Sequence, residues 1–195
     1  MSGLWLALSS SSPLVSRAWL RGDKVIWSAF GDAGHAPSSW LSAGLAEDQA
    51  NGLRLDELTG IVADLGPGGF SAVKAGVTMA KTLAYALNLP VAGVSAFDLI
   101  DPKRPVAIPR VKQEVYFRTP GQEPVLVPAA AIPGDALGYG VPFPEPDYPL
   151  AERAATLFDQ LIWVSAAELV PDYLAAPSIS QAKKPFIMGE TFRPS

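Results

Sequence analysis

Three observations predict an α/β fold in two lobes for this chain of 195 residues. Short apolar runs alternate with two helical segments over the first 100 residues, in the order βββαβαβ. A glycine-rich turn, Gly66 to Gly69, joins one of these apolar runs to a long helix of small residues. Beyond residue 100 prolines become dense and helical patterns disappear until late in the chain. We therefore expect an N-terminal lobe over residues 1–100 and a smaller second lobe over residues 101–195.

The chain opens with three predicted strands. They cover Leu4 to Leu8, Leu14 to Leu20 and Lys24 to Phe30, and polar turns separate them at Ser9 to Pro13 and at Arg21-Gly-Asp23. Short connections of this kind join antiparallel neighbours, so a three-stranded meander is expected.

The first predicted helix covers Ser38 to Ala50. Pro37 stands near its start, where a missing backbone N–H costs little, and Asn51-Gly52 follows its last residue. After it, Gly60 to Leu65 is a short β-branched run that suits a buried strand.

The second predicted helix follows the glycine turn. Gly66, Gly68 and Gly69 permit backbone angles that other residues avoid, and Ser71 is expected to cap a helix that runs to Leu87 without a proline. The Asn88-Leu-Pro90 segment then ends this helix and leads into a short strand at Val91 to Val94.

The second lobe is predicted to hold short strands and one late helix. The expected strands are Pro105 to Ile108, Glu114 to Arg118 and Val125 to Val127. A helix is expected at Leu150 to Ile162, with Leu150, Ala154, Leu157, Phe158 and Leu161 on one stripe. After Pro171 the chain has no periodicity, which predicts extended or disordered chain, and the pair Lys183-Lys184 is expected to be solvated.

The glycine turn is the candidate ligand site. A strand, a glycine turn and a helix N-terminus together favour a phosphate cradle, formed here by Gly66, Gly68, Gly69, Phe70 and Ser71. The spacing matches neither a Walker A loop nor a dinucleotide fingerprint, because Ser71 stands where the third glycine of the latter would be. Glycine-rich turns of this kind are common and many bind nothing, so we expect at most a vestigial phosphate site.

Composition narrows the possible functions. With 49% hydrophobic residues the chain can form a packed core, and its net charge of −4 argues against non-specific binding of nucleic acid. The chain has no cysteine, which excludes disulfides and thiolate metal sites, and its one histidine, His35, excludes the paired histidines of metallohydrolases. The lack of cysteine fits a cytoplasmic protein, and without thiolates or paired histidines we expect no metal site. The apolar run Leu4 to Leu8 is too short to span a membrane, so we expect no membrane segment.

Four segments carry a resemblance to a known family. They are Gly66-Pro-Gly-Gly-Phe-Ser-Ala-Val-Lys-Ala-Gly76, Leu89-Pro-Val-Ala-Gly-Val-Ser95, Pro109-Arg-Val-Lys-Gln-Glu-Val-Tyr-Phe117 and Pro171-Asp-Tyr-Leu174. With the element order of residues 4–100, they resemble the TsaB family of bacteria, also called YeaZ. The chain departs from that family's pattern at Gly69 and at Lys74, where an arginine is frequent.

The resemblance implies an actin-like ATPase fold, related to ribonuclease H, and a role without catalysis. TsaB binds TsaD, which forms threonylcarbamoyl-adenosine next to the tRNA anticodon, and TsaE joins them as an ATPase. It implies a homodimer when TsaD is absent, contact with tRNA only through the complex, and no cofactor. The residues agree, since the end of the first strand, where actin-like phosphotransferases place an aspartate, carries Ser9, and a hydroxyl is a poor Mg²⁺ ligand.

The helical segments are expected to form the partner interface. In the family these two helices bundle with TsaD or with a second TsaB, and small or adaptable side chains allow close helix approach. The interface candidates are Trp40, Leu41, Leu45, Val73, Val77, Met79 and Ala80.

Two other functions remain open from the sequence. The chain could be a stand-alone nucleotide-binding protein or degraded kinase, with its phosphate on the turn from Gly66 to Phe70, or a structural homodimer with no link to tRNA. For His35, a loop or helix-capping position is favoured over a catalytic one.

Overall fold

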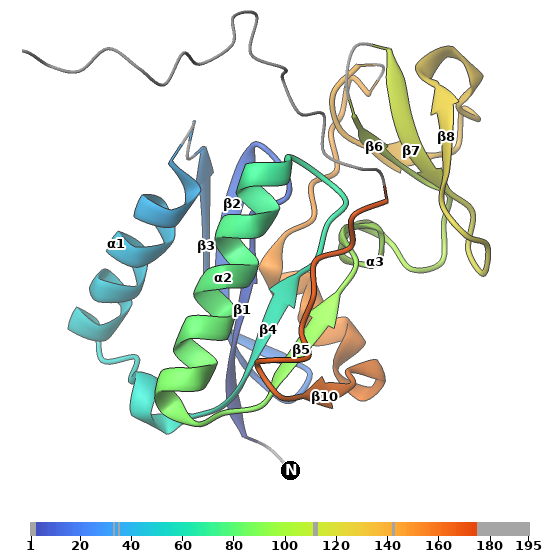
Figure 1. The fold of residues 1–195 in the computed structure, drawn as a ribbon. Helices are drawn as coiled ribbons and strands as arrows, with labels where there is room; N and C mark the ends of the chain where they lie inside the picture. The colour runs from blue at the N-terminus through green and yellow to red at the C-terminus, as the bar shows by residue number, and fades with distance from the viewer. Residues whose placement is uncertain (1–2, 33, 35, 111–112, 142, 175–195) are drawn as a thin grey trace, which may run out of the picture.

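The computed structural model describes residues 3–32, 34, 36–110, 113–141 and 143–174 (Figure 1). The predicted order of the N-terminal lobe is confirmed, with element ends that differ by a residue or two. Its elements are β1 (Leu4–Ser9), β2 (Leu14–Arg21), β3 (Lys24–Asp32), α1 (Pro37–Ala50), the 3-10 turn η1 (Leu55–Glu57), β4 (Leu58–Asp64), α2 (Phe70–Leu87) and β5 (Val91–Val94).

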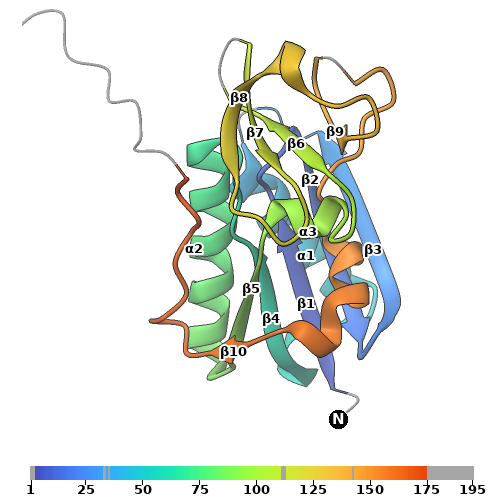
Figure 2. The same ribbon diagram turned by 90° about the vertical axis from the view of Figure 1, so that its right-hand side faces the viewer.

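These strands form a six-stranded sheet with a late strand, β10 (Trp163–Val164), in the order β10-β5-β4-β1-β2-β3. The opening meander is antiparallel, whereas β1 pairs with β4, and β4 with β5, in parallel. Helices α1 and α2 lie side by side over one face, and residues 151–160 lie on the other (Figures 1 and 2).

Strand β1 shows why the sheet is covered on both faces. Leu6 and Leu8 pack in the core that α1 and α2 complete, while the alternate side chains of Trp5 and Ala7 pack in the core on the opposite face. Side chains alternate along a strand, so a run that is apolar at every position must bury both faces. The all-apolar run at the start of the chain thus corresponds to a central strand.

The second sheet contains the three strands expected after residue 100. The elements here are α3 (Ala96–Ile100), β6 (Val106–Pro109), β7 (Glu114–Arg118), β8 (Val125–Pro128), the 3-10 turn η2 (Ala129–Ala131) and β9 (Leu137–Gly138). The sheet order is β8-β7-β6-β9. The short helix α3 was not predicted, although Ser95 caps it by accepting a hydrogen bond from the amide of Phe97.

The late helix occurs where it was expected but has another geometry. Ala151–Gln160 forms a 3-10 helix, η3, rather than an α-helix. Ala151, Ala154 and Leu157 are buried at a spacing of three, the repeat of a 3-10 helix, and they pack against the first sheet. Phe158 and Leu161 of the predicted stripe are half-buried and pack against the same core, whereas Leu150 is half-buried and stands before the first residue of η3.

The chain after residue 150 belongs structurally to the first sheet. Strand β10 (Trp163–Val164) pairs antiparallel with β5. Residues 165–174 then run beside α2 without regular structure (Figure 2). The Nζ of Lys81 donates to the Leu169 carbonyl at 2.8 Å, and the amide of Asp172 donates to the Leu65 carbonyl at 2.8 Å. A boundary between lobes at residue 100 stays a prediction, and the lysine pair at 183–184 lies outside the described residues.

Candidate functional site

Helix α2 begins one residue earlier than expected. Gly69 is its N-cap and no side chain caps it, so the prediction that Ser71 caps the helix was wrong. The cause is the turn before it: the amide of Gly69 donates to the Ser11 carbonyl at 3.1 Å, which fixes the chain at the point where the helix starts. Ser71 is instead exposed in the first turn of α2.

Gly68 lets the glycine turn lie directly against the β1–β2 connection. A Cβ added at Gly68 would stand 2.0 Å from the Ser11 carbonyl oxygen, far inside contact distance, whereas one at Gly69 would meet only the Ala72 Cβ at 3.7 Å. The first glycine is therefore required by packing, and the second is not.

A buried carboxyl, Asp64, receives the hydrogen bonds around this turn. Its Oδ1 accepts from the amide of Gly66 at 2.8 Å. Its Oδ2 accepts from the amide of Ser11 at 3.2 Å and lies 2.7 Å from the Ser9 hydroxyl. Two amides of the turn, those of Gly66 and Gly69, thus already have acceptors within the protein, and this geometry disfavours a phosphate at the predicted cradle.

The surroundings of Asp64 shift its carboxyl toward the neutral form. Burial raises the pKa of its carboxyl above the ordinary value, against the opposing effect of its hydrogen bonds. The Ser9 hydroxyl has one proton but lies within hydrogen-bonding distance of both Asp64 and the Pro149 carbonyl. Both contacts are satisfied when the protonated Asp64 donates to Ser9 and Ser9 donates to Pro149. The sequence analysis did not select Asp64, although a carboxylate at the end of a buried strand was a visible signal.

The other members of the predicted cradle lie apart from Asp64. Phe70 is exposed and its ring packs against that of Tyr173, with centroids 5.1 Å apart. Among the described residues, no cluster of three histidine or acidic side chains is placed to hold a metal ion. His35, for which a loop or capping position was favoured, lies outside the described residues.

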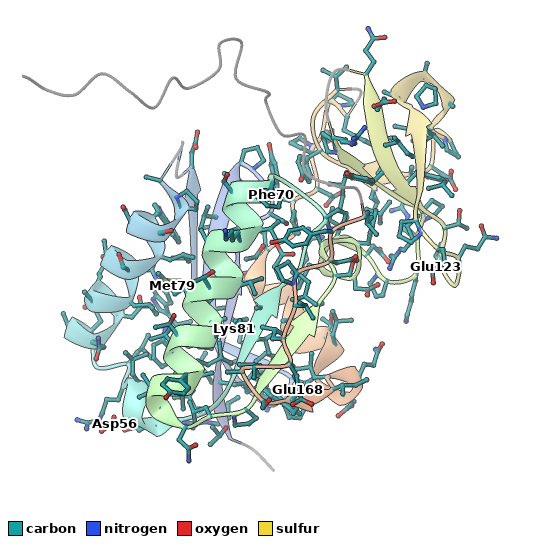
Figure 3. All side chains as sticks on the ribbon, viewed as in Figure 1. Asp56, Phe70, Met79, Lys81, Glu123 and Glu168 are labelled. Atoms are coloured by element: carbon teal, nitrogen blue, oxygen red, sulfur yellow. The ribbon has the colours of Figure 1, made fainter. Side chains whose placement is uncertain are left out.

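A groove of about 620 Å³ separates the exposed sides of α1 and α2. Figure 3 shows Met79 on the side of α2 that faces α1. Its lining residues include both apolar and polar side chains: Ser38, Ser42, Leu45, Ala46, Gln49, Leu55, Ser71, Lys74, Ala75, Thr78, Met79, Thr82 and Leu83. It is an elongated, largely apolar surface bounded by two parallel-lying helices.

Most of the predicted interface residues are in the protein's own core. Five of them are buried at 6% exposure or less: Leu41, Leu45, Val73, Val77 and Ala80. Of these, Leu45 also borders the groove. Met79 is half-buried and lines the groove, so it is the candidate that best fits a partner contact.

Trp40 has a structural partner within the chain. The guanidinium of Arg17, itself buried, lies between the rings of Trp27 and Trp40, 4.8 and 4.9 Å from their centroids. The same guanidinium forms two hydrogen bonds to Asp48 of α1, at 2.9 and 2.8 Å. This buried group attaches α1 to the sheet and so fixes one wall of the groove.

The groove residues that the sequence analysis missed follow a helical spacing. On α2 the buried residues Val73, Val77 and Ala80 form one stripe, and Ala75, Thr78 and Thr82 lie on the adjacent one. To tell these two stripes apart, one must know which of them faces the sheet. The sequence does not show this, because small and apolar residues occur around nearly the whole circumference of the helix.

Two comparisons with known proteins each match a part of this chain. The model of the TsaD family, described as tRNA N6-adenosine threonylcarbamoyltransferase, matches residues 47–100, which include β4, the glycine turn, α2 and β5. The tRNA threonylcarbamoyladenosine biosynthesis protein TsaB of Bacillus subtilis (strain 168) is 43% identical over 44 residues. That match spans 23% of this chain and 19% of the relative's length.

Two solved structures match nearly the whole chain. YeaZ from Pseudomonas aeruginosa superposes with a TM-score of 0.71 at 24% identity, covering 88% of this chain and 100% of that one. The chain has the YeaZ fold. A second structure, described as an uncharacterized protein with similarity to peptidase YEAZ from Pseudomonas aeruginosa, gives a TM-score of 0.75 at 20% identity, over 89% of this chain and 100% of that one. The predicted α/β, actin-like fold and the resemblance to TsaB (YeaZ) are thereby confirmed.

Within the YeaZ fold, the glycine turn and the α1–α2 groove are separate features joined by α2. The turn lies at the N-terminus of this helix and the groove along its exposed side. In the part of the chain that the structure describes, no helix is both long and apolar enough to cross a membrane.

Proposed function

We propose that this chain is a noncatalytic partner protein in the formation of threonylcarbamoyladenosine on tRNA in the cytoplasm. It binds a TsaD protein through the α1–α2 groove, works with TsaE, pairs with a second copy of itself when TsaD is absent, and meets tRNA only within the complex. The observation that carries this proposal is the groove itself, a largely apolar surface of about 620 Å³ on the helix that the TsaD-family match includes.

The composition of the groove supports a helix as its occupant. Small side chains, such as Ala46 and Ala75, let a partner backbone approach closely, and Met79 adapts to an irregular neighbour. The exposed serine and threonine side chains among its lining residues keep the free protein hydrated. A surface of this kind suits a partner that is exchanged rather than one that is permanently buried.

The geometry around Asp64 supports a role without catalysis. Ser9 stands at the end of β1, and its hydroxyl is taken up by Asp64 and Pro149. Asp64 is 3% exposed, and burial raises the pKa of its carboxyl, so it is a poor candidate for a Mg²⁺ ligand. The chain's one histidine also rules out the two-histidine metal site of metallopeptidases.

Mixing this chain with TsaD from the same source tests the proposal, with light scattering after size exclusion as the measurement. We expect a one-to-one complex that replaces the homodimer. Met79→Glu should abolish both assemblies, because the complex would bury a charge without a partner. Ser39→Glu places the same charge on an exposed position of α1 outside the groove and should leave both assemblies intact.

Circular dichroism of each variant must show the native fold for the comparison to count. A complex that forms equally well with Met79→Glu would contradict the groove as the interface. A homodimer that ignores TsaD would leave a structural dimer with no link to tRNA. Calorimetry of the isolated chain with ATP tests the stand-alone nucleotide-binding alternative, for which we expect no heat because the amides of Gly66 and Gly69 already have acceptors.

A further inference from the structure

A second hollow lies at the opposite end of α2 from the glycine turn. It has a volume of about 650 Å³ and lies where the last turn of α2 meets β10 and the residues after it. Its lining residues are Ala84, Tyr85, Asn88, Leu89, Pro90, Trp163, Val164, Ser165, Ala166, Ala167 and Glu168. It shares none of these with the α1–α2 groove.

Two of the residues that line this hollow carry aromatic rings that are exposed to solvent. Tyr85 is 86% exposed and Trp163 is 36% exposed, although side chains of this size are costly to leave in water. Trp163 also borders a smaller neighbouring hollow of about 230 Å³, shared with Trp5 and Phe158. Gly60 makes room for this arrangement, because a Cβ there would lie 2.4 Å from the Trp163 ring.

Glu168 is the one charged side chain among the lining residues, all of which are described. The amide and hydroxyl of Ser165 donate to its Oε2 at 2.9 and 2.6 Å. These hydrogen bonds lower the pKa of the carboxyl, so it is ionised and held in one orientation at neutral pH. In the described part of the chain its other oxygen, Oε1, accepts no hydrogen bond and is available to a ligand.

The end of α2 adds negative potential to the hollow. The helix has 18 residues and no basic residue in its last turn, so the negative end of its dipole lies here without a cation. The carbonyls of Ala84 and Tyr85 accept from the amides of Leu89 and Asn88. The nearest cation on the helix, Lys81, is engaged with the Leu169 carbonyl and does not line the hollow. Figure 3 places Lys81 further up α2 and Glu168 below it, near β10.

We propose that this hollow binds an organic cation with an apolar stem, of the arginine or lysine type. Aromatic faces attract such cations, and the fixed carboxylate of Glu168 supplies the opposite charge. A phosphate-bearing ligand is disfavoured because no lysine or arginine lines the surface. The site is independent of the partner role proposed for the groove.

Titration with N-acetylarginine amide tests the site, followed through the indole N–H signal of Trp163 by NMR. N-acetylcitrulline amide has the same shape without the charge and serves as the matched ligand. We expect the arginine compound to move the Trp163 signal saturably and to bind roughly tenfold more tightly than the citrulline compound. Equal binding of the two would overturn the proposal.

Substitutions test whether the binding detected at Trp163 depends on Glu168. Glu168→Gln keeps an acceptor for Ser165 but removes the charge, and should weaken binding of the arginine compound by roughly tenfold. Glu123→Gln makes the same charge change between β7 and β8 of the second sheet, where Figure 3 shows it far from β10, and should leave the affinity unchanged. Unaltered affinity in Glu168→Gln would also overturn the proposal.

Titration with agmatine in place of N-acetylarginine amide then distinguishes two sources of the cation. Tighter binding of agmatine assigns a free small cation, and tighter binding of the amide assigns a polypeptide side chain.

Discussion

Arg17 shows how one residue can set the position of a whole element. Its guanidinium is buried, bonded twice to Asp48 and enclosed by two tryptophan rings. Asp48 also accepts from the indole N–H of Trp19 at 2.8 Å. A Cβ at Gly44 would fall 2.3 Å from the guanidinium, so α1 passes directly over this group.

We expect Arg17→Met to destabilise the protein by about 3–5 kcal/mol, because it leaves the Asp48 carboxylate buried without its cation. Urea unfolding measures the change. Arg54→Met removes an exposed pair with Asp56 and should leave the unfolding midpoint almost unchanged. A loss in Arg17→Met no larger than that in Arg54→Met would show that the buried pair contributes nothing.

The raised pKa of Asp64 makes a prediction about pH. The unfolded carboxyl titrates near its ordinary value, about 3.9, and the folded one above it, so the folded state binds the proton more tightly. The stabilisation from this proton is complete below the unfolded value and is lost as pH rises through the folded value.

Wild-type protein should therefore lose more stability than Asp64→Asn as pH rises through this window. Urea unfolding at a series of pH values measures the difference between the two slopes. The variant will be less stable throughout, since its single amide oxygen cannot accept from the amides of both Gly66 and Ser11, which bind opposite oxygens of the carboxyl, but only the slope bears on the prediction. Parallel pH profiles would mean that folding does not raise the pKa of the Asp64 carboxyl.

At the scale of elements, the presence of glycine in the turn before α2 is explained by packing rather than by the geometry of a bound ligand. Its backbone approaches the β1–β2 connection so closely that Gly68 has no room for a side chain. The turn thereby joins the end of β1 to the start of α2 through the Ser11 carbonyl and Asp64.

Gly68→Ala should destabilise the fold by about 1–3 kcal/mol, the usual cost of overpacking a tight site. Gly69→Ala, one residue later, has space for its methyl group and should change stability little. Thermal unfolding of the two variants checks the pair. Similar melting temperatures for both would mean that the backbone near Ser11 yields without cost.

At the scale of the whole molecule, the first sheet depends on the chain's far end. One of its faces is covered by Ala151, Ala154, Ala155 and Leu157 of η3, which pack with Trp5 and other strand residues. Strand β10 then extends the sheet at β5, and Leu169 enters the core on the other face.

A fragment of residues 1–100 should therefore fail to fold, because one apolar face of its sheet would be open to water. A chain of residues 1–174 should fold as the full protein does. Near-ultraviolet circular dichroism of both fragments makes the comparison. A folded 1–100 fragment would establish the boundary at residue 100 as a true domain boundary.

The amino-acid sequence by itself determined the order of helices and strands up to residue 94, the place of the glycine turn and strands β6, β7 and β8 of the second sheet. These depend on local properties: apolar periodicity, glycine and proline positions, and turn residues within a few positions of one another. The 3-10 geometry of η3 was beyond that reasoning, because packing against the sheet, rather than local propensity, selects it.

Only the tertiary structure decided which side chains are available to a partner or a ligand. Leu41 and Val73 look as suitable for an interface as Met79 in the sequence, but the first two fill the protein's own core. The partners of Asp64 and the hollow beside Trp163 likewise join residues far apart in the chain. Burial and hydrogen bonding of this kind arise from three-dimensional proximity, which no spacing within a single segment encodes.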